Sequence, residues 1–156
     1  MKKPKIPWRE LDKPIAGLVR SLNAVPYIAT TSSCQGEEDR SRLFNPEVKA
    51  HDQYANVLFR IEQGYELELE RLAQAMGAYA IGDFGEGYIV ECVKRMYVKD
   101  GELPLLHHDF GVHIMLQDRV PQVHRLSVQE RRVLFDQGIH RVEEAVKAYL
   151  GQREVR

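Results

Sequence analysis

The sequence predicts an α+β fold, a single-domain two-layer sandwich in which helices cover a mostly antiparallel sheet. Apolar residues recur at helical spacing near both ends of the chain and near its middle. The segments between them alternate apolar and polar residues, as half-buried strands do. The elements therefore follow the order α-β-β-α-β-β-α, and helices separated by pairs of strands favour antiparallel pairing. The 156 residues are expected to form one domain, over 1–156.

The first half of the chain carries two helix signals and two strand signals. Leu11, Ile15 and Leu18 begin an apolar stripe at helical spacing, whereas Ala55 and Val57 alternate with polar neighbours. The polar residues between these elements are typical of an exposed loop. The expected elements are a helix over roughly 9–23, a strand over 25–31, an exposed loop over 37–52, a strand over 54–61 and a helix from about Tyr65 to Gly77.

The second half begins with a glycine-punctuated turn over 82–87, which lacks the glycine order of a dinucleotide-binding loop. Asp100 and Gly101 form a second turn signal. Ser127 and Glu130 match the capping box that starts a helix. The expected elements are strands over 88–98 and 110–117 and a helix from Ser127 to about Leu150, with flexible tails over 1–8 and 151–156.

Composition and net charge limit the classes of molecule that the protein is expected to bind. The chain is 44% hydrophobic and 29% charged, which is typical of globular proteins rather than disordered ones. Its formal net charge of −1 argues against binding nucleic acid through bulk positive charge, so RNA is a candidate partner that net charge does not support. Arginines near and within the last predicted helix could form a basic stripe, but acidic residues are interleaved with them, which predicts a solvated helix face. These arginines are Arg125, Arg131, Arg132 and Arg141.

The number of cysteines and the length of the apolar runs indicate the cellular compartment of the protein. Cys34 and Cys92 are the only cysteines, and they form neither a disulfide framework nor a zinc-binding pair motif. The N-terminal segment has no apolar core of signal-peptide length, and no run approaches the ~18 apolar residues of a membrane span. We therefore expect a cytoplasmic protein with reduced thiols and no membrane partner.

The most informative stretch is polar and follows the first predicted strand. Hydroxyls, a thiol and an amide are concentrated there, where a simple turn would use Asn, Asp or Pro. Loop residues at the end of a rigid strand are common binding positions, and the hydroxyls and amides beside a glycine can hold an anion. Alternatively, the hydroxyls make local turn hydrogen bonds and Cys34 is a small buried residue. The expected ligand-binding residues are Thr31, Ser32, Ser33, Cys34, Gln35 and Gly36.

Histidines supply the remaining chemical candidates. With Cys34 as a candidate nucleophile, His51 beside Asp52 is a candidate general base. A second group could bind a transition metal, although extended geometry separates its first and last histidines by ~20 Å. The alternative interpretation is a set of polar residues on an exposed sheet face. The candidate metal ligands are His107, His108, Asp109 and His113.

The segment from Leu22-Asn23 through Tyr27-Ile28-Ala29 to Thr30–Gly36 resembles a known signature. It is similar to the N-terminal region of the tRNA wybutosine-synthesising methyltransferase family, where a helix and a strand lead into a T-x-S-S-C-x-G loop. It also resembles small uncharacterised bacterial and phage proteins with the same loop. The resemblance covers about fifteen residues, and Glu37 stands where the methyltransferases have arginine. It implies an AdoMet-dependent enzyme acting on tRNA, with this loop near its active site.

Three classes of function follow from these observations. The first is a small domain that recognises a ligand or nucleotide, with the polar loop lining its pocket. The second is an enzyme, either an AdoMet-dependent RNA modifier or a thiol/histidine hydrolase. The third is a non-enzymatic accessory factor of a phage or mobile element that binds a protein partner through an acidic or arginine-rich helix.

Overall fold

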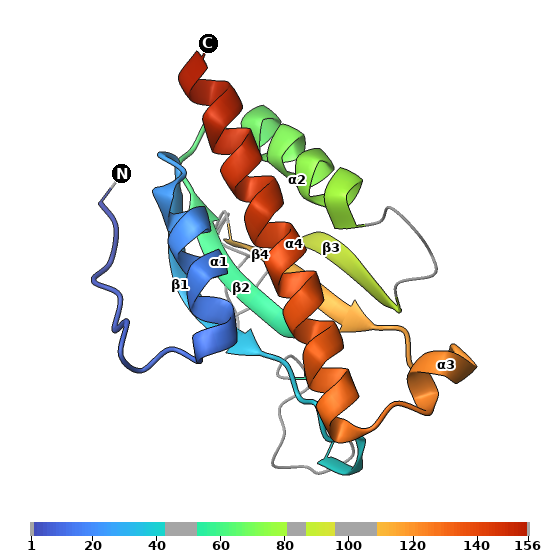
Figure 1. Ribbon diagram of the computed structural model, residues 1–156. Helices are drawn as coiled ribbons and strands as arrows, with labels where there is room; N and C mark the ends of the chain where they lie inside the picture. The colour runs from blue at the N-terminus through green and yellow to red at the C-terminus, as the bar shows by residue number, and fades with distance from the viewer. Residues whose placement is uncertain (1, 43–52, 81–86, 96–108, 156) are drawn as a thin grey trace, which may run out of the picture.

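The computed structural model describes residues 2–42, 53–80, 87–95 and 109–155. It confirms the predicted α+β fold, and apart from two short helical turns its elements follow the predicted order (Figure 1). The elements are α1 (Lys13–Ala24), β1 (Ile28–Gln35), the short 3-10 helix η1 (Arg40–Arg42), β2 (Ala55–Ile61), α2 (Glu66–Ala80), β3 (Tyr88–Arg95), β4 (Asp109–Leu116), α3 (Pro121–His124) and α4 (Val128–Val155).

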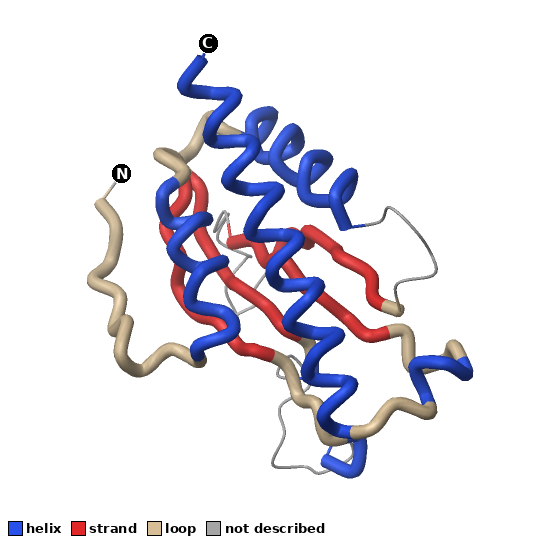
Figure 2. Tube along the Cα trace, viewed as in Figure 1, coloured by secondary structure: helices blue, strands red, loops and turns tan. Residues whose placement is uncertain are grey.

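The four described strands form one antiparallel sheet in the order β1-β2-β4-β3. The connection through α2 carries the chain from β2 past β4 to the outer strand β3, so β1 and β3 are the two edges. Figure 2 shows α1, α2 and α4 together on one face of this sheet. We call the opposite side, which carries Asn56, Leu58, His113 and Met115, the helix-free face, because none of these three helices covers it.

The core lies between the sheet and the three long helices. Along β2, Ala55, Val57 and Phe59 are at most 1% exposed, and the residues between them, Asn56 and Leu58, point to the helix-free face. Full burial of a valine or phenylalanine side chain is worth roughly 1.5–3 kcal/mol, so this alternation fixes the register of the sheet. The helix α4 supplies one side of the core with Phe135, Ile139, Val142, Ala145, Val146 and Tyr149.

The predicted boundary between the first strand and the polar loop is wrong. β1 begins at Ile28, not at 25, and continues to Gln35 through the whole hydroxyl-rich stretch. Threonine favours extended structure, and an edge strand can leave polar side chains in solvent. The turn comes instead at Gly36, whose positive φ of 86° suits a glycine.

For α2 and α4 the helix starts were predicted more closely than the helix ends, whereas α1 begins at Lys13 and not at 9. The capping box is confirmed, since Ser127 Oγ accepts from the Glu130 N–H at 3.1 Å and Glu130 Oε1 accepts from the Ser127 N–H at 3.2 Å. In contrast, α2 continues through Gly77 to Ala80, because a helix tolerates an internal glycine at a cost of about 1 kcal/mol. α4 likewise runs past Leu150 to Val155, through residues predicted as a tail.

Candidate functional site

The polar stretch from Thr31 to Gly36 lies in three different environments. Register with β2 shifts between Thr30 and Ser32, so Thr31 is an extra residue that forms a β-bulge in the edge strand. Bulges redirect side chains and are common at sheet edges and beside active sites. Beyond the bulge, Ser33 is opposite Val57 and points toward the helices, whereas Cys34 is opposite Asn56 and points to the helix-free face.

Thr31, Ser32 and Ser33 line a cavity of about 220 Å³ at the outer edge of β1. We call it the β1-edge pocket. Its walls come from the N-terminal segment, the start of α1 and the hydroxyl run of β1. The hydroxyls of these three residues make no hydrogen bond with any residue that the structure describes, so a ligand can use them. The lining residues are Pro4, Lys5, Ile6, Pro7, Leu11, Val19, Thr30, Thr31, Ser32 and Ser33.

The N-terminal segment that closes this pocket is held by Lys3. Its ammonium donates to the carbonyl oxygens of Asn23 and Val25 near the end of α1, the latter at 2.9 Å. Partial burial lowers the pKa of Lys3. A more open groove of about 480 Å³ adjoins the pocket and shares Pro4 and Thr31 with it. That groove is also lined by Lys2, Lys3, Ala29 and Arg60.

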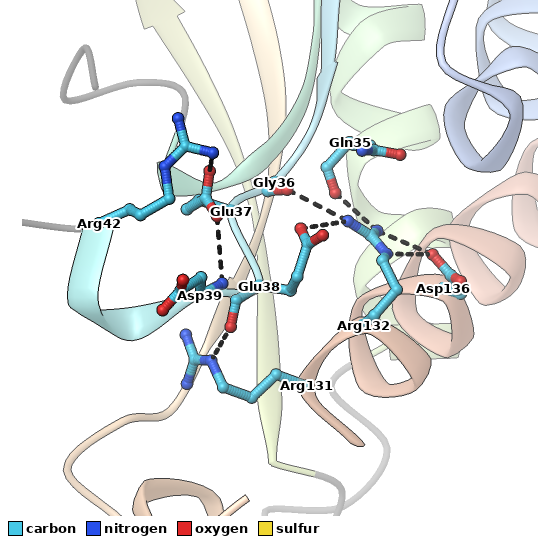
Figure 3. A network of polar contacts seen from close by, with 9 residues as sticks. All are labelled: Gln35, Gly36, Glu37, Glu38, Asp39, Arg42, Arg131, Arg132 and Asp136. Atoms are coloured by element: carbon cyan, nitrogen blue, oxygen red, sulfur yellow. Dashed lines mark hydrogen bonds and ion pairs between the residues drawn. The ribbon is translucent and has the colours of Figure 1, made fainter. Parts of the chain in front are cut away.

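The backbone of Gln35 and Gly36 is occupied by a different set of contacts, shown in Figure 3. Arg132 of α4 donates to the Gln35 carbonyl at 2.7 Å and to the Gly36 carbonyl at 3.1 Å. Its Nε donates to Asp136 one turn later at 2.9 Å. Both carbonyls at the end of β1 are therefore bonded within the protein, and Arg132 ties this part of the predicted site to α4.

Arg131 extends the same network and is only 2% exposed. Its Nε donates to the Glu38 carbonyl at 2.9 Å, and its two Nη atoms donate to the carboxylate of Asp118. The predicted solvated face is therefore wrong for Arg131, and Arg132 is also mostly covered, with 18% of its side chain exposed. A buried guanidinium needs such partners, because an unpaired buried charge is costly.

Cys34 belongs to a row of four polar side chains across the helix-free face. Register places Cys34 opposite Asn56, Asn56 opposite His113, and His113 opposite Glu91. Asn56 is 2% exposed, and the His113 ring stacks on Tyr54 with centroids 6.1 Å apart. One strand separates Cys34 from His113, so their Cα atoms are about 10 Å apart. This separation is too great for direct proton transfer between the two side chains.

The other thiol is structural. Cys92 is opposite Val112 and points toward the helices, and burial raises the pKa of its thiol to about 11. The thiol therefore stays protonated at neutral pH and is a poor nucleophile.

Asp109 and His113 are the two metal candidates that lie among the described residues. Asp109 and His113 lie four residues apart on β4 and share its helix-free face, as extended geometry predicts, but they are about 13 Å apart. Asp109 pairs with Arg60 at 3.0 Å. Among residues 2–42, 53–80, 87–95 and 109–155, no group of three or more His, Cys, Asp or Glu side chains could hold a metal ion. The candidates His51, His107 and His108 lie outside the described residues.

Several residues of the β1-edge pocket were missed from sequence. Lys5, Pro7 and Leu11 come from a segment that was predicted partly as a tail, and their approach to β1 is a long-range contact. The only local signal was the set of basic residues Lys2, Lys3, Lys5 and Arg9, with no acidic residue among residues 2–9.

Comparison with known proteins identifies no family for this chain. A scan against protein-family models, a search of curated proteins and a search of solved structures each returned no match to the chain. Within the described residues, no helix combines the length and apolar character needed to cross a membrane.

Proposed function

We propose that the protein is a small-ligand-binding domain that takes a phosphate-bearing ligand of the nucleotide class in the β1-edge pocket. The observation that carries this proposal is that three hydroxyl-bearing residues, Thr31, Ser32 and Ser33, line one cavity together with Lys5. Hydroxyls and an ammonium are donors to phosphate oxygens, and charge-assisted hydrogen bonds are the stronger kind. The β-bulge at Thr31 supports the proposal because it breaks the regular alternation of side chains at this point.

Charge around the pocket favours an anion. Residues 2–9 contain Lys2, Lys3, Lys5 and Arg9 and no acidic residue. Arg60 adds a cation to the adjoining groove, although Asp109 offsets its charge. Lys5 and Lys2 form no ion pair with the described residues, so their charge is available to an incoming ligand.

The sizes of the two spaces suggest how a ligand is divided between them. The pocket, at about 220 Å³, is below the ≈ 300–1,000 Å³ typical of sites for larger ligands. It fits a phosphate or sugar-phosphate group better than a whole nucleotide. The adjoining groove is larger and shares Pro4 and Thr31, so the remainder of the ligand lies there.

Trp8 provides the test, because it is the only tryptophan and lies on the segment that closes the pocket. Its ring is stacked by Arg20 at 5.0 Å and is 40% exposed. We expect its fluorescence to change on titration with AMP or inorganic phosphate and not with adenosine. A ligand at a hundredfold excess over its Kd should stabilise the fold by about 2.7 kcal/mol in a thermal-shift assay.

Matched variants identify the groups that bind. Lys5→Gln and Thr31→Val should each weaken AMP binding by about tenfold, since each removes a donor to the phosphate. Lys13→Gln is the control, because Lys13 is exposed on the same basic segment and does not line the pocket. Equal affinity in all four proteins would contradict the proposal.

AdoMet belongs in the same titration, because the resemblance of residues 22–36 implies an AdoMet-dependent enzyme. A response of Trp8 to AdoMet that AMP does not produce would favour that second function. If no small anion has any effect, a non-enzymatic accessory role becomes the better hypothesis, and a protein partner should then be sought.

A further inference from the structure

A second cavity, of about 450 Å³, lies at the end of the sheet where β4 leads into α3 and α4 begins. We call it the β4-end cavity, and it shares no residue with the β1-edge pocket. Most of its wall is apolar, with two aromatic rings and several aliphatic side chains, which is the usual composition of a small-molecule site. The apolar lining residues are Tyr54, Ile89, Met115, Leu116, Val120 and Phe135.

The charged residues of this cavity leave an excess of positive charge. Its lining includes Asp118, Arg119 and Arg131. Asp118 accepts from Arg131 and also lies 3.5 Å from the Nε of Arg40, so two cations offset its single charge. Arg119 is exposed at the rim and forms no ion pair with the described residues. A ligand that enters here therefore meets a net positive field.

Gln117 contributes a polar group that has no partner. Its Oε1 atom is buried and makes no hydrogen bond with any part of the chain that the structure describes. A buried amide group without a partner is unusual, because leaving it unsatisfied costs free energy. Gln117 lines the same cavity, and its unpartnered atom is the amide oxygen, an acceptor. Turning the amide over exchanges this oxygen for the Nε2 N–H group, which can donate to an incoming acceptor.

We propose that the β4-end cavity binds a monocarboxylate that carries an aromatic or other apolar body. The body packs against Tyr54, Met115 and Phe135, and the carboxylate lies between the Arg119 guanidinium and the Gln117 amide. Arginine suits this role because its planar donors match the two oxygens of a carboxylate. The inference is independent of the function proposed for the β1-edge pocket, since it uses other residues and another ligand chemistry.

The methyl group of Met115 gives a direct readout. Met115 is one of four methionines in the chain, so protein labelled with ¹³C-methyl methionine gives few signals, and a Met115→Leu variant assigns the relevant one. The probe is naphthalene-2-carboxylate, and the matched neutral probe is naphthalene-2-carboxamide. We expect the carboxylate to shift the Met115 signal with at least tenfold higher affinity than the carboxamide. Equal affinities, or no shift with either probe, would overturn the proposal.

Two pairs of variants test the polar contacts. Arg119→Gln should weaken the carboxylate by about tenfold, whereas Arg125→Gln, an exposed arginine outside the cavity, should leave its affinity unchanged. Gln117→Leu should also weaken it, with the exposed Gln122→Leu as control. If Arg119→Gln and Gln117→Leu both bind as the wild type does, the carboxylate is not recognised here and the proposal is wrong.

Trp8 separates this result from the other proposal. It lies on the segment that closes the β1-edge pocket and does not line the β4-end cavity. Naphthalene-2-carboxylate should therefore shift Met115 without weakening the response of Trp8 to AMP. Competition between the two ligands would show that they share a site and would overturn the assignment to the β4-end cavity.

Discussion

The polar stretch that begins in β1 has two halves, residues 31–33 and residues 35–38. They differ in whether their polar groups form hydrogen bonds within the protein. In the first half, residues 31–33, the hydroxyls make no hydrogen bond with the described residues and line a cavity. In the second half, residues 35–38, Arg131 and Arg132 bond three backbone carbonyls (Figure 3). Polar groups that are hydrogen-bonded within the fold stabilise it, whereas polar groups without such bonds at a cavity are available to a ligand. The comparison therefore connects the second half with stability, and the first half is the one for which we propose ligand binding.

The largest effect should come from Arg131→Ala. The substitution leaves the Glu38 carbonyl without its donor and removes the cation that holds Asp118. Breaking a buried ion pair usually costs 3–5 kcal/mol, and because Asp118 is 32% exposed we expect about 3 kcal/mol. Urea unfolding measures this, with Arg125→Ala as the exposed control. A loss below about 1 kcal/mol would mean that the second half is not structural.

Gly36→Ala should have the next largest effect. Gly36 has a φ of 86°, and an added Cβ would lie 2.8 Å from Phe135 and 2.9 Å from the Ala55 nitrogen. Left-handed backbone and overpacking together should cost about 2 kcal/mol. Gly151→Ala is the matched control, since it is helical with nothing within 4 Å, and it should stabilise by up to about 1 kcal/mol. Similar thermal unfolding of the two variants would contradict this account.

Lys3→Met should have a smaller effect that depends on pH. Lys3 donates two hydrogen bonds, and their loss should cost about 1 kcal/mol at neutral pH. Because burial lowers the pKa of Lys3, the unfolded chain binds its proton more tightly, and Lys3 adds stability as pH rises through its folded pKa toward 10.5. The difference in stability between wild type and variant should therefore widen toward pH 10.5. If the difference in stability between wild type and Lys3→Met stays constant with pH, protonation of Lys3 is not linked to folding.

Thr31→Val should have the smallest effect on stability. The hydroxyl makes no hydrogen bond with the described residues, and valine suits an extended strand, so the change should stay below about 0.5 kcal/mol. In contrast, the same substitution should weaken AMP binding by about tenfold. If Thr31→Val destabilises the protein as much as Arg131→Ala does, the assignment of roles to the two halves is reversed.

Local patterns account for most of the fold that could be predicted. The alternation in β2 and the capping box at Ser127 and Glu130 depend on neighbouring residues, and both predictions are confirmed. The end of β1 was misplaced because consecutive Thr and Ser residues are typical both of loops and of exposed edge strands. An edge strand needs no apolar alternation on its solvent side, so the pattern that identifies β2 is absent.

The site was only partly predictable, because its geometry depends on contacts between distant segments. Thr31, Ser32 and Ser33 were named from sequence, whereas Lys5 reaches them through the path of the N-terminal segment. The burial of Arg131 depends on Glu38 and Asp118, which a charge pattern along one helix does not reveal. The row from Cys34 to Glu91 likewise follows from strand register, which no single segment of sequence specifies.

The long helix α4 has a consequence for the nascent chain during synthesis. It covers the sheet between α1 and α2 and closes the core with Phe135, Ile139 and Val142 (Figure 1). Until residues 128–155 have left the ribosome, the apolar face of the strands is exposed. Exposed sheet faces of this kind attract other chains, so an emerging polypeptide of this sequence should depend on chaperones until α4 docks.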